Sequence, residues 1–222
     1  QRRDSPPGYG ACVASRPPLA WGIAFLELES PMSAVVQADL PSLPGLLDRQ
    51  ALRPALAAAA DAASASGHAL ALLTLDLDHF KDYQDRAGEA AARQVLTQLA
   101  LLLEQLKPPT ARLAYLGADE FVLILPDCQL AQATALAERL RERIAAALAQ
   151  LDQQPPLTAT LGVAATPPGR GWSAESLLAL ADTRMTFAKR RLPPHHNLVW
   201  AGALPSDWLG RLGLSAGSWP GL

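Results

Sequence analysis

The sequence predicts a mixed α/β (α+β) domain whose elements follow the order β-α-β-β-α-β, the ferredoxin-like arrangement. One observation behind this is the run ALALLTLDL at residues 69–77, whose continuous apolar character is typical of a buried central strand. Another is a pair of short apolar runs, at residues 111–115 and 120–125, whose close spacing indicates a hairpin. Helical patterns lie on both sides of this pair. We therefore expect an antiparallel sheet of four or five strands that is backed by helices.

The helices are predicted from apolar residues that recur at spacings of three and four. These patterns predict helices at residues 52–63, 95–106, 136–151 and 173–188. Gly67 is expected to stop the first helix, and Pro108 the second. Ser173 is a candidate N-cap of the last helix. Two further strands are predicted at residues 157–163 and 197–200.

The chain has 222 residues, of which 50% are hydrophobic, and this length fits one domain with extensions. We expect the folded domain at residues 39–200. Residues 1–38 are interpreted as a linker or the end of an upstream domain, with a short strand at 20–28. For the tail, residues 201–222, two interpretations stay open. Either its tryptophans pack on the domain or on a neighbouring subunit, or the tail is a disordered end.

The composition excludes several classes of function. A formal net charge of -2 gives no general attraction to nucleic acids or acidic membranes, so no nucleic-acid partner is expected. No apolar run approaches the roughly 18 residues of a membrane-spanning helix. Cys12 and Cys128 are expected to be free thiols in a reducing compartment, which favours a cytoplasmic location. Because the chain begins at Gln1, we interpret it as part of a longer protein, whose other parts would supply any membrane attachment.

Acidic residues lie where the predicted central strand ends and in the predicted hairpin. Asp76 and Asp78 belong to the strand, and Asp119 and Glu120 belong to the hairpin. Because the first and third strands of this topology are neighbours, these carboxylates should converge. Oxygen ligands of this kind suit Mg²⁺, which takes one or two carboxylates together with phosphate oxygens. The alternative is that these acids are merely solvated.

The segment that follows the central strand has features of a phosphate site. We expect a loop there, whose free backbone N–H groups at His79 and Phe80 face phosphate oxygens. Lys81 adds a positive charge to this loop. Lys189, on the last predicted helix, is a second cation for the same phosphates, although a single helical lysine is more often solvated.

Five ordered blocks of the sequence resemble the GGDEF family, the diguanylate cyclases of bacterial second-messenger signalling. They are LPGLLDR at residues 43–49, LDLDHFKDYQDRAGEAAARQVL at 75–96, LGADEFVLIL at 116–125, LGVA at 161–164, and the segment 181–189. The resemblance covers residues 39–200. It implies a sheet like that of nucleotidyl cyclases and polymerase palms, flanked by helices. It also implies one GTP and two Mg²⁺ per subunit, with two subunits facing each other to make cyclic di-GMP.

The resemblance also assigns roles to individual residues. It makes Asp76 and Asp119 metal ligands, assisted by the carbonyl of Leu77. Glu120 is the second acid of the motif, and the resemblance implies that Asp119 and Glu120 act in metal coordination and catalysis. The phosphate contacts that it carries over are His79, Phe80, Lys81 and Lys189.

The departures from the family concentrate on the side that would bind the base. The asparagine that contacts the guanine edge corresponds to Gln84, and the aspartate that accepts from guanine N–H groups corresponds to Arg93. Arg93 replaces an acceptor by a donor, so the guanine donors would lack partners, at roughly 1–3 kcal/mol each. The second glycine of the turn, after Gly117, corresponds to Ala118, whose Cβ obstructs close approach of a nucleotide. Further departures are Glu89, Ala92 and Pro193.

Three functional hypotheses follow from these residues. The first is a degenerate GGDEF domain without catalytic activity, which regulates cyclic di-GMP signalling by binding a nucleotide or a protein. The second is an active diguanylate cyclase that condenses two GTP molecules with Mg²⁺. The third is a dimerisation scaffold whose acids have no function. The partners expected are GTP or another purine nucleotide, a protein partner or upstream sensor domain, and a second copy in a homodimer.

Overall fold

The computed structural model describes residues 40, 43–151, 154–166 and 173–210. The predicted strand at residues 20–28, Cys12 and Trp219 therefore lie outside the described residues. In the part of the chain that is described, no helix has the length and apolar composition required to cross a membrane.

The elements follow the predicted order, with two additions. They are α1 (Arg49–Ser66), β1 (Leu70–Asp78), α2 (Phe80–Ala87), α3 (Glu89–Leu106), β2 (Arg112–Gly117), β3 (Glu120–Pro126), α4 (Leu130–Leu148), a 3₁₀ turn (Ala149–Leu151), β4 (Thr158–Ala165), α5 (Ala174–Arg191), β5 (Val199–Trp200) and α6 (Ser206–Gly210). The additions are α2 and α6. Gly67 ends α1 in the left-handed conformation, and the Ser173 hydroxyl caps α5 by accepting from the N–H of Ser176, both as predicted.

The sheet has five strands in the order β2-β3-β1-β4-β5. β1 lies at its centre and pairs antiparallel with both β3 and β4, which confirms the predicted neighbourhood of the first and third strands. β5 pairs parallel with β4 through only two residues, so the sheet is mixed at this edge and not wholly antiparallel as expected. The reason is topological, because α5 returns the chain to the end of the sheet at which β4 began.

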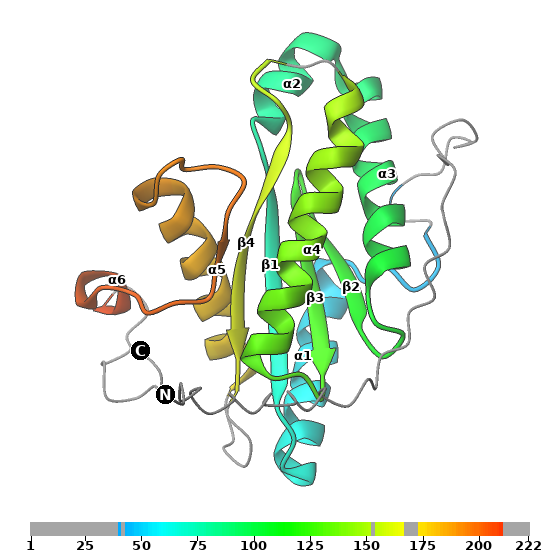
Figure 1. The fold of residues 1–222 in the computed structure, drawn as a ribbon. Helices are drawn as coiled ribbons and strands as arrows, with labels where there is room; N and C mark the ends of the chain where they lie inside the picture. Colours follow the sequence, from blue (N-terminus) through cyan, green and yellow to red (C-terminus); the bar gives the residue numbers. More distant parts are fainter. Residues whose placement is uncertain (1–39, 41–42, 152–153, 167–172, 211–222) are drawn as a thin grey trace, which may run out of the picture. The chain divides into compact units, whose positions relative to one another are not determined.

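Helices cover both faces of the sheet, as Figure 1 shows. On one face α3 and α4 pack over alternate strand residues such as Leu73 and Leu123. On the other face α1 and α5 pack over the intervening residues, such as Leu72 and Ile124. Because β1 is buried on both faces, it contains the continuous apolar run that the sequence shows.

The segment after β1 differs from the expected loop. α2 begins at Phe80, directly after His79, which takes the left-handed conformation with φ 62°. Phe80 and Tyr83 are buried on one side of this eight-residue helix, and Gly88 separates it from α3. Two apolar residues are too few to show a helical pattern in the sequence. The helix therefore depends on the packing of Phe80 and Tyr83 against the rest of the domain.

Asp78 has a structural position and is not an open ligand at the strand end. Its side chain is fully buried and accepts hydrogen bonds from Thr158 Oγ1 at 2.7 Å and Thr160 Oγ1 at 2.9 Å. It also accepts from the backbone N–H of Asn197 at 2.8 Å. This carboxylate therefore joins the end of β1 to β4 and to the segment before β5.

The described part of the tail packs on the domain. Trp208 in α6 is buried and meets the ring of Phe187 edge-on, with centroids 5.2 Å apart. Arg184 in α5 is buried and donates to the carbonyls of Gly202 and Val163, at 3.0 and 2.7 Å, so it joins the tail to the sheet. Burial lowers the pKa of Arg184 to about 10. These contacts support the first interpretation of the tail as far as Trp208.

A glycine in β4 permits the close approach of α5. A Cβ built on Gly162 would lie 2.0 Å from the carbonyl oxygen of Ala181 and 2.6 Å from the nitrogen of Met185. Both are backbone atoms of a packed helix, so neither can move without displacing α5. The position of α5 on the sheet therefore requires glycine at residue 162.

We predict that Gly162→Ala destabilises the domain by about 3 kcal/mol or more, because the added methyl group would overlap backbone atoms of α5 that cannot shift without moving the helix. The matched control is Ala165→Val, which enlarges a half-buried residue of the same strand and should cost much less. Urea unfolding followed by circular dichroism measures both. Equal stability of Gly162→Ala and the parent chain would show that α5 is not held at this distance.

Candidate functional site

Carboxylates from β1 and from the β2–β3 hairpin converge at the end of the central strands. Asp76 is the register partner of Glu120 across the β1–β3 pair. Asp119 lies in the turn just before β3, and its carbonyl accepts from the N–H of Leu77 at 3.4 Å. The structure thus brings Asp76, Asp119 and Glu120 together, as the topology predicted.

The hairpin turn requires unusual backbone conformations. Gly117 has φ 102° and Ala118 has φ 54°, both in the left-handed region. A non-glycine residue there costs roughly 1–2 kcal/mol. The hydroxyl of Tyr115 donates to the Ala118 carbonyl at 3.1 Å and braces the turn. Ala118 is therefore tolerated in a position that favours glycine.

Arg49, which the sequence analysis did not single out, joins α1 to this hairpin. Its Nε and Nη2 donate to the carbonyl of Leu116 at 3.1 and 2.8 Å. Nη2 also lies 3.7 Å from Glu120 Oε2, as an exposed ion pair. The signal that could have found Arg49 is its place at the end of the LPGLLDR block.

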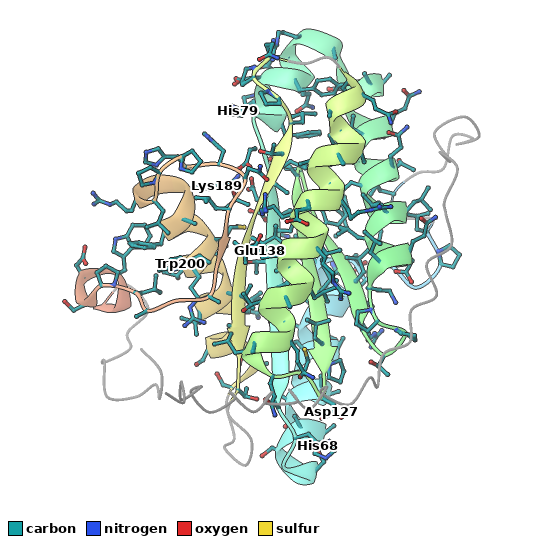
Figure 2. The ribbon with its side chains drawn as sticks, viewed as in Figure 1. His68, His79, Asp127, Glu138, Lys189 and Trp200 are labelled. Atoms are coloured by element: carbon teal, nitrogen blue, oxygen red, sulfur yellow. The ribbon has the colours of Figure 1, made fainter. Side chains whose placement is uncertain are left out.

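Lys189 reaches the acids from the end of α5. Its ammonium group contacts Asp76 Oδ1, lies 3.3 Å from Asp78 Oδ1, and lies 3.5 Å from the Leu77 carbonyl oxygen. Figure 2 shows Lys189 directed from α5 toward the sheet. In this arrangement the lysine neutralises the carboxylates of β1, whereas the sequence analysis expected it on phosphates.

Burial and neighbouring negative charge act on the remaining acids, although Arg49 pairs with Glu120. Burial, and then the nearby Asp76, raise the pKa of Asp119 to about 6. Burial and Asp76 also raise the pKa of Glu120. Burial raises the pKa of Asp76 itself, although Lys189 opposes this. Such crowding of partly buried carboxylates favours the binding of a cation.

The donor set fits Mg²⁺ by its chemistry. The groups available are the carboxylates of Asp76 and Asp119 and the carbonyl of Leu77, all oxygen donors. No three His, Cys, Asp or Glu side chains within the described ranges form a complete ligand cluster. Mg²⁺ does not need one, since it keeps waters and binds one or two carboxylates together with phosphate oxygens. Lys189 would have to leave Asp76 when the metal binds.

The expected phosphate residues are only partly brought together. His79 and Phe80 lie at the start of α2, whose first-turn N–H groups have no side-chain cap. Lys81 is exposed and pairs with Asp85 at 3.6 Å on the outer side of α2, so its described contacts do not include the acids. The rings of His196 and His79 are in contact at a tilt of 41°, with centroids 4.2 Å apart. The sequence analysis missed His196, because a histidine among prolines is typical of a loop.

The two positions expected to bind the base, Gln84 and Arg93, lie on α2 and α3. Gln84 is half-buried on α2, and Arg93 is exposed on α3. The charge of Arg93 lowers the pKa of Tyr115, while burial and Asp119 raise it more. Arg93 is therefore near the hairpin.

Comparisons with known proteins agree with this geometry. The family model described as "Diguanylate cyclase, GGDEF domain" matches residues 38–192. An uncharacterised signalling protein of Caulobacter vibrioides is 39% identical over 154 residues, which are 68% of this chain and 19% of that protein. The response regulator PleD of the same species is 32% identical over 150 residues, 66% of this chain and 33% of PleD.

A solved structure shows the same fold. The crystal structure of the GGDEF domain of DgcB from Caulobacter crescentus, in complex with c-di-GMP, has a TM-score of 0.63 and 26% sequence identity. The alignment covers 76% of this chain and 96% of that domain. The chain thus spans a third or less of the two longer relatives and nearly all of an isolated domain.

We predict that Asp119→Asn stabilises the domain at neutral pH. The pKa of Asp119 rises from 3.8 to about 6 on folding, so the folded state loses stability as the pH rises from about 4 to about 6. About 2 pKa units correspond to ~3 kcal/mol, and screening of this half-exposed side chain reduces the gain to about 1 kcal/mol. The gain should vanish near pH 4, where the acid is protonated in the folded state.

Unfolding midpoints between pH 4 and pH 8 test this. Asp61→Asn, at an exposed residue of α1, is the matched control and should change little. A stabilisation by Asp119→Asn that does not depend on pH would contradict the electrostatic explanation.

Proposed function

Because the chain belongs to the diguanylate cyclase, GGDEF domain family, we propose that it serves cyclic di-GMP signalling as a regulatory module that binds a nucleoside triphosphate and makes no cyclic di-GMP. The observation that carries this proposal is the division of the site. The acids and Lys189 form one compact group, while the base-side positions hold Gln84 and Arg93.

The metal and phosphate half supports binding. Asp76, Asp119 and the Leu77 carbonyl would hold Mg²⁺, which would neutralise the triphosphate. Glu120 stays beside Arg49 as the second acid of the motif. Lys189 can move from Asp76 to a phosphate oxygen once the metal takes its place on the carboxylate. The N–H groups at His79 and Phe80 then add donors at the start of α2.

The base half argues against catalysis. Arg93 presents donors to the donor edge of guanine, and Gln84 displaces its amide by one methylene. The Cβ of Ala118 stands at the turn where the family has glycine. A misplacement of about 1 Å costs on the order of 10²-fold in rate when two reacting groups must be aligned. Two nucleotides on facing subunits would both suffer this loss.

The alternative is an active diguanylate cyclase, and the retained Asp119 and Glu120 favour it. In either case the partners proposed are GTP or another purine nucleotide, a second copy of the chain, and a protein partner or upstream sensor domain. The proposed location is the cytoplasm, where nucleoside triphosphates are available. No nucleic-acid partner is proposed.

The first prediction concerns the nucleotide. We expect Mg²⁺-dependent binding of GTP and ATP with little preference for guanine, since a family contact to its N–H groups is missing. Asp76→Ala should abolish binding, because it removes a carboxylate that faces the metal. Isothermal titration calorimetry with and without EDTA measures this, and Asp61→Ala on the exposed side of α1 is the control. Binding of equal strength in EDTA would show that the acids are not ligands.

The second prediction concerns turnover. The unmodified chain should form no detectable cyclic di-GMP from GTP and Mg²⁺, even at concentrations that favour dimers. The combination Gln84→Asn, Arg93→Asp and Ala118→Gly should restore selectivity for GTP before it restores turnover. Chromatographic detection of product measures both steps. Product from the unmodified chain that disappears on Glu120→Ala would establish the active cyclase instead.

A further inference from the structure

A cleft between α1 and α5 lies on the same face of the sheet as the acids, and Arg49 and Glu120 of the candidate site form part of its border. Its cavity measures about 320 Å³. The floor includes side chains of β1 and β3 that point to this face, among them Thr74 and Val122. Cavities that bind small molecules begin at roughly this size and combine an apolar lining with a few polar groups. The cleft is large enough for a molecule of amino-acid size.

The two walls of the cleft have opposite charges. α1 contributes Arg49 and Arg53, which are four residues apart and therefore share one helix face. α5 contributes Glu175 and Asp182, two helical turns apart. The part of the structure that is described shows no hydrogen bond or ion pair from Arg53, Glu175 or Asp182. Arg53 on one wall and two carboxylates on the other are thus available to a ligand.

A buried hydroxyl on the floor lacks a partner. Thr74 is only 4% exposed, and its Oγ1 has no hydrogen-bond partner among the described residues. An unsatisfied buried polar group of this kind costs roughly 1–3 kcal/mol. Rotation about the Cα–Cβ bond exchanges the hydroxyl and the methyl group of threonine, so Oγ1 can meet a ligand without movement of the strand. This hydroxyl is an observation independent of the charged walls.

We propose that the cleft binds a small zwitterion, an α-amino acid with an apolar side chain. Its carboxylate would face Arg53, its ammonium group would face Asp182, and its side chain would lie on the apolar floor with Thr74 as a third polar contact. A simple anion would leave the carboxylates of α5 without a partner. A simple amine would leave Arg53 without one. Only a ligand with both charges complements both walls.

The cleft is adjacent to the nucleotide site but separate from it. Thr74 and Asp76 are two residues apart on the same face of β1, and Glu120 borders both the cleft and the acid group. A bound zwitterion would hold α1 against α5 and so steady Arg49 on the hairpin. Zwitterion binding does not require Mg²⁺, so it can succeed or fail independently of triphosphate binding.

Isothermal titration calorimetry of the full chain with leucine, methionine and phenylalanine tests the proposal. We expect saturable binding of at least one of them. Isopentylamine and 4-methylpentanoate, which each retain one charge of leucine, should bind at least tenfold more weakly. Equal binding of either single-charge compound, or no binding of any amino acid, would overturn the proposal.

Variants test the individual contacts. Thr74→Val should weaken binding about tenfold while it raises the unfolding midpoint, because it removes the unpaired hydroxyl without changing the volume. Ala179→Leu on the α5 wall should abolish binding by filling the cavity, with an unchanged circular dichroism spectrum. Thr97→Val, in α3 on the other face, is the matched control and should bind normally.

Binding that is insensitive to both Thr74→Val and Ala179→Leu would place the ligand elsewhere and refute the assignment. Arg53→Gln and Asp182→Asn complete the test, since each removes one charge from a wall. Each variant should lower the affinity for the amino acid about tenfold. Arg53→Gln should leave the affinity for isopentylamine unchanged, and Asp182→Asn should leave that for 4-methylpentanoate unchanged. An Arg53→Gln or Asp182→Asn variant that binds the amino acid as tightly as the parent chain would overturn the proposed contacts.

Discussion

The ammonium group of Lys189 is the interaction on which the site depends. It lies among Asp76, Leu77 and Asp78, the last residues of β1, and compensates two carboxylates that would otherwise repel each other. Its position is set by the packing of α5 on β4, where Gly162 lets the helix come close. The charge balance of the site therefore depends on a backbone contact in another part of the fold. A helix only slightly displaced would leave the acids uncompensated.

Environment gives similar carboxylates different roles. Asp78 is fully buried but accepts three hydrogen bonds, so it is a structural link between β1, β4 and the segment before β5. Asp119 is half-exposed and its pKa is raised to about 6, chiefly by burial and by Asp76. The first acid is satisfied by the protein, and the second retains unfavourable charge that a cation would relieve. A carboxylate with a raised pKa of this kind is typical of binding sites.

The acidic residues and the positions expected to bind the base lie on different elements. The acids and Lys189 belong to β1, the hairpin and α5, whereas Gln84 and Arg93 belong to α2 and α3. Because α2 and α3 pack on the opposite face of the sheet from α1 and α5, changes in one half leave the packing of the other intact. On the function proposed here, this separation would let base-side residues change while the acids keep their positions. The cleft between α1 and α5 lies on the side of the acids.

Local patterns in the sequence determined the order of the elements, the hairpin, the stop at Gly67 and the cap at Ser173, because each depends on residues close together in the chain. They also predicted that Asp76, Asp119 and Glu120 converge, since the β-α-β-β-α-β topology makes β1 and β3 neighbours. Only the tertiary structure decided that α2 replaces a loop, that β5 is parallel, and that Asp78 is structural. It also decided that Lys189 lies on Asp76, 113 residues away, while Lys81 points outward. Such contacts result from the packing of helices that are far apart in the chain on one sheet. The spacing of apolar residues within a short segment cannot predict them.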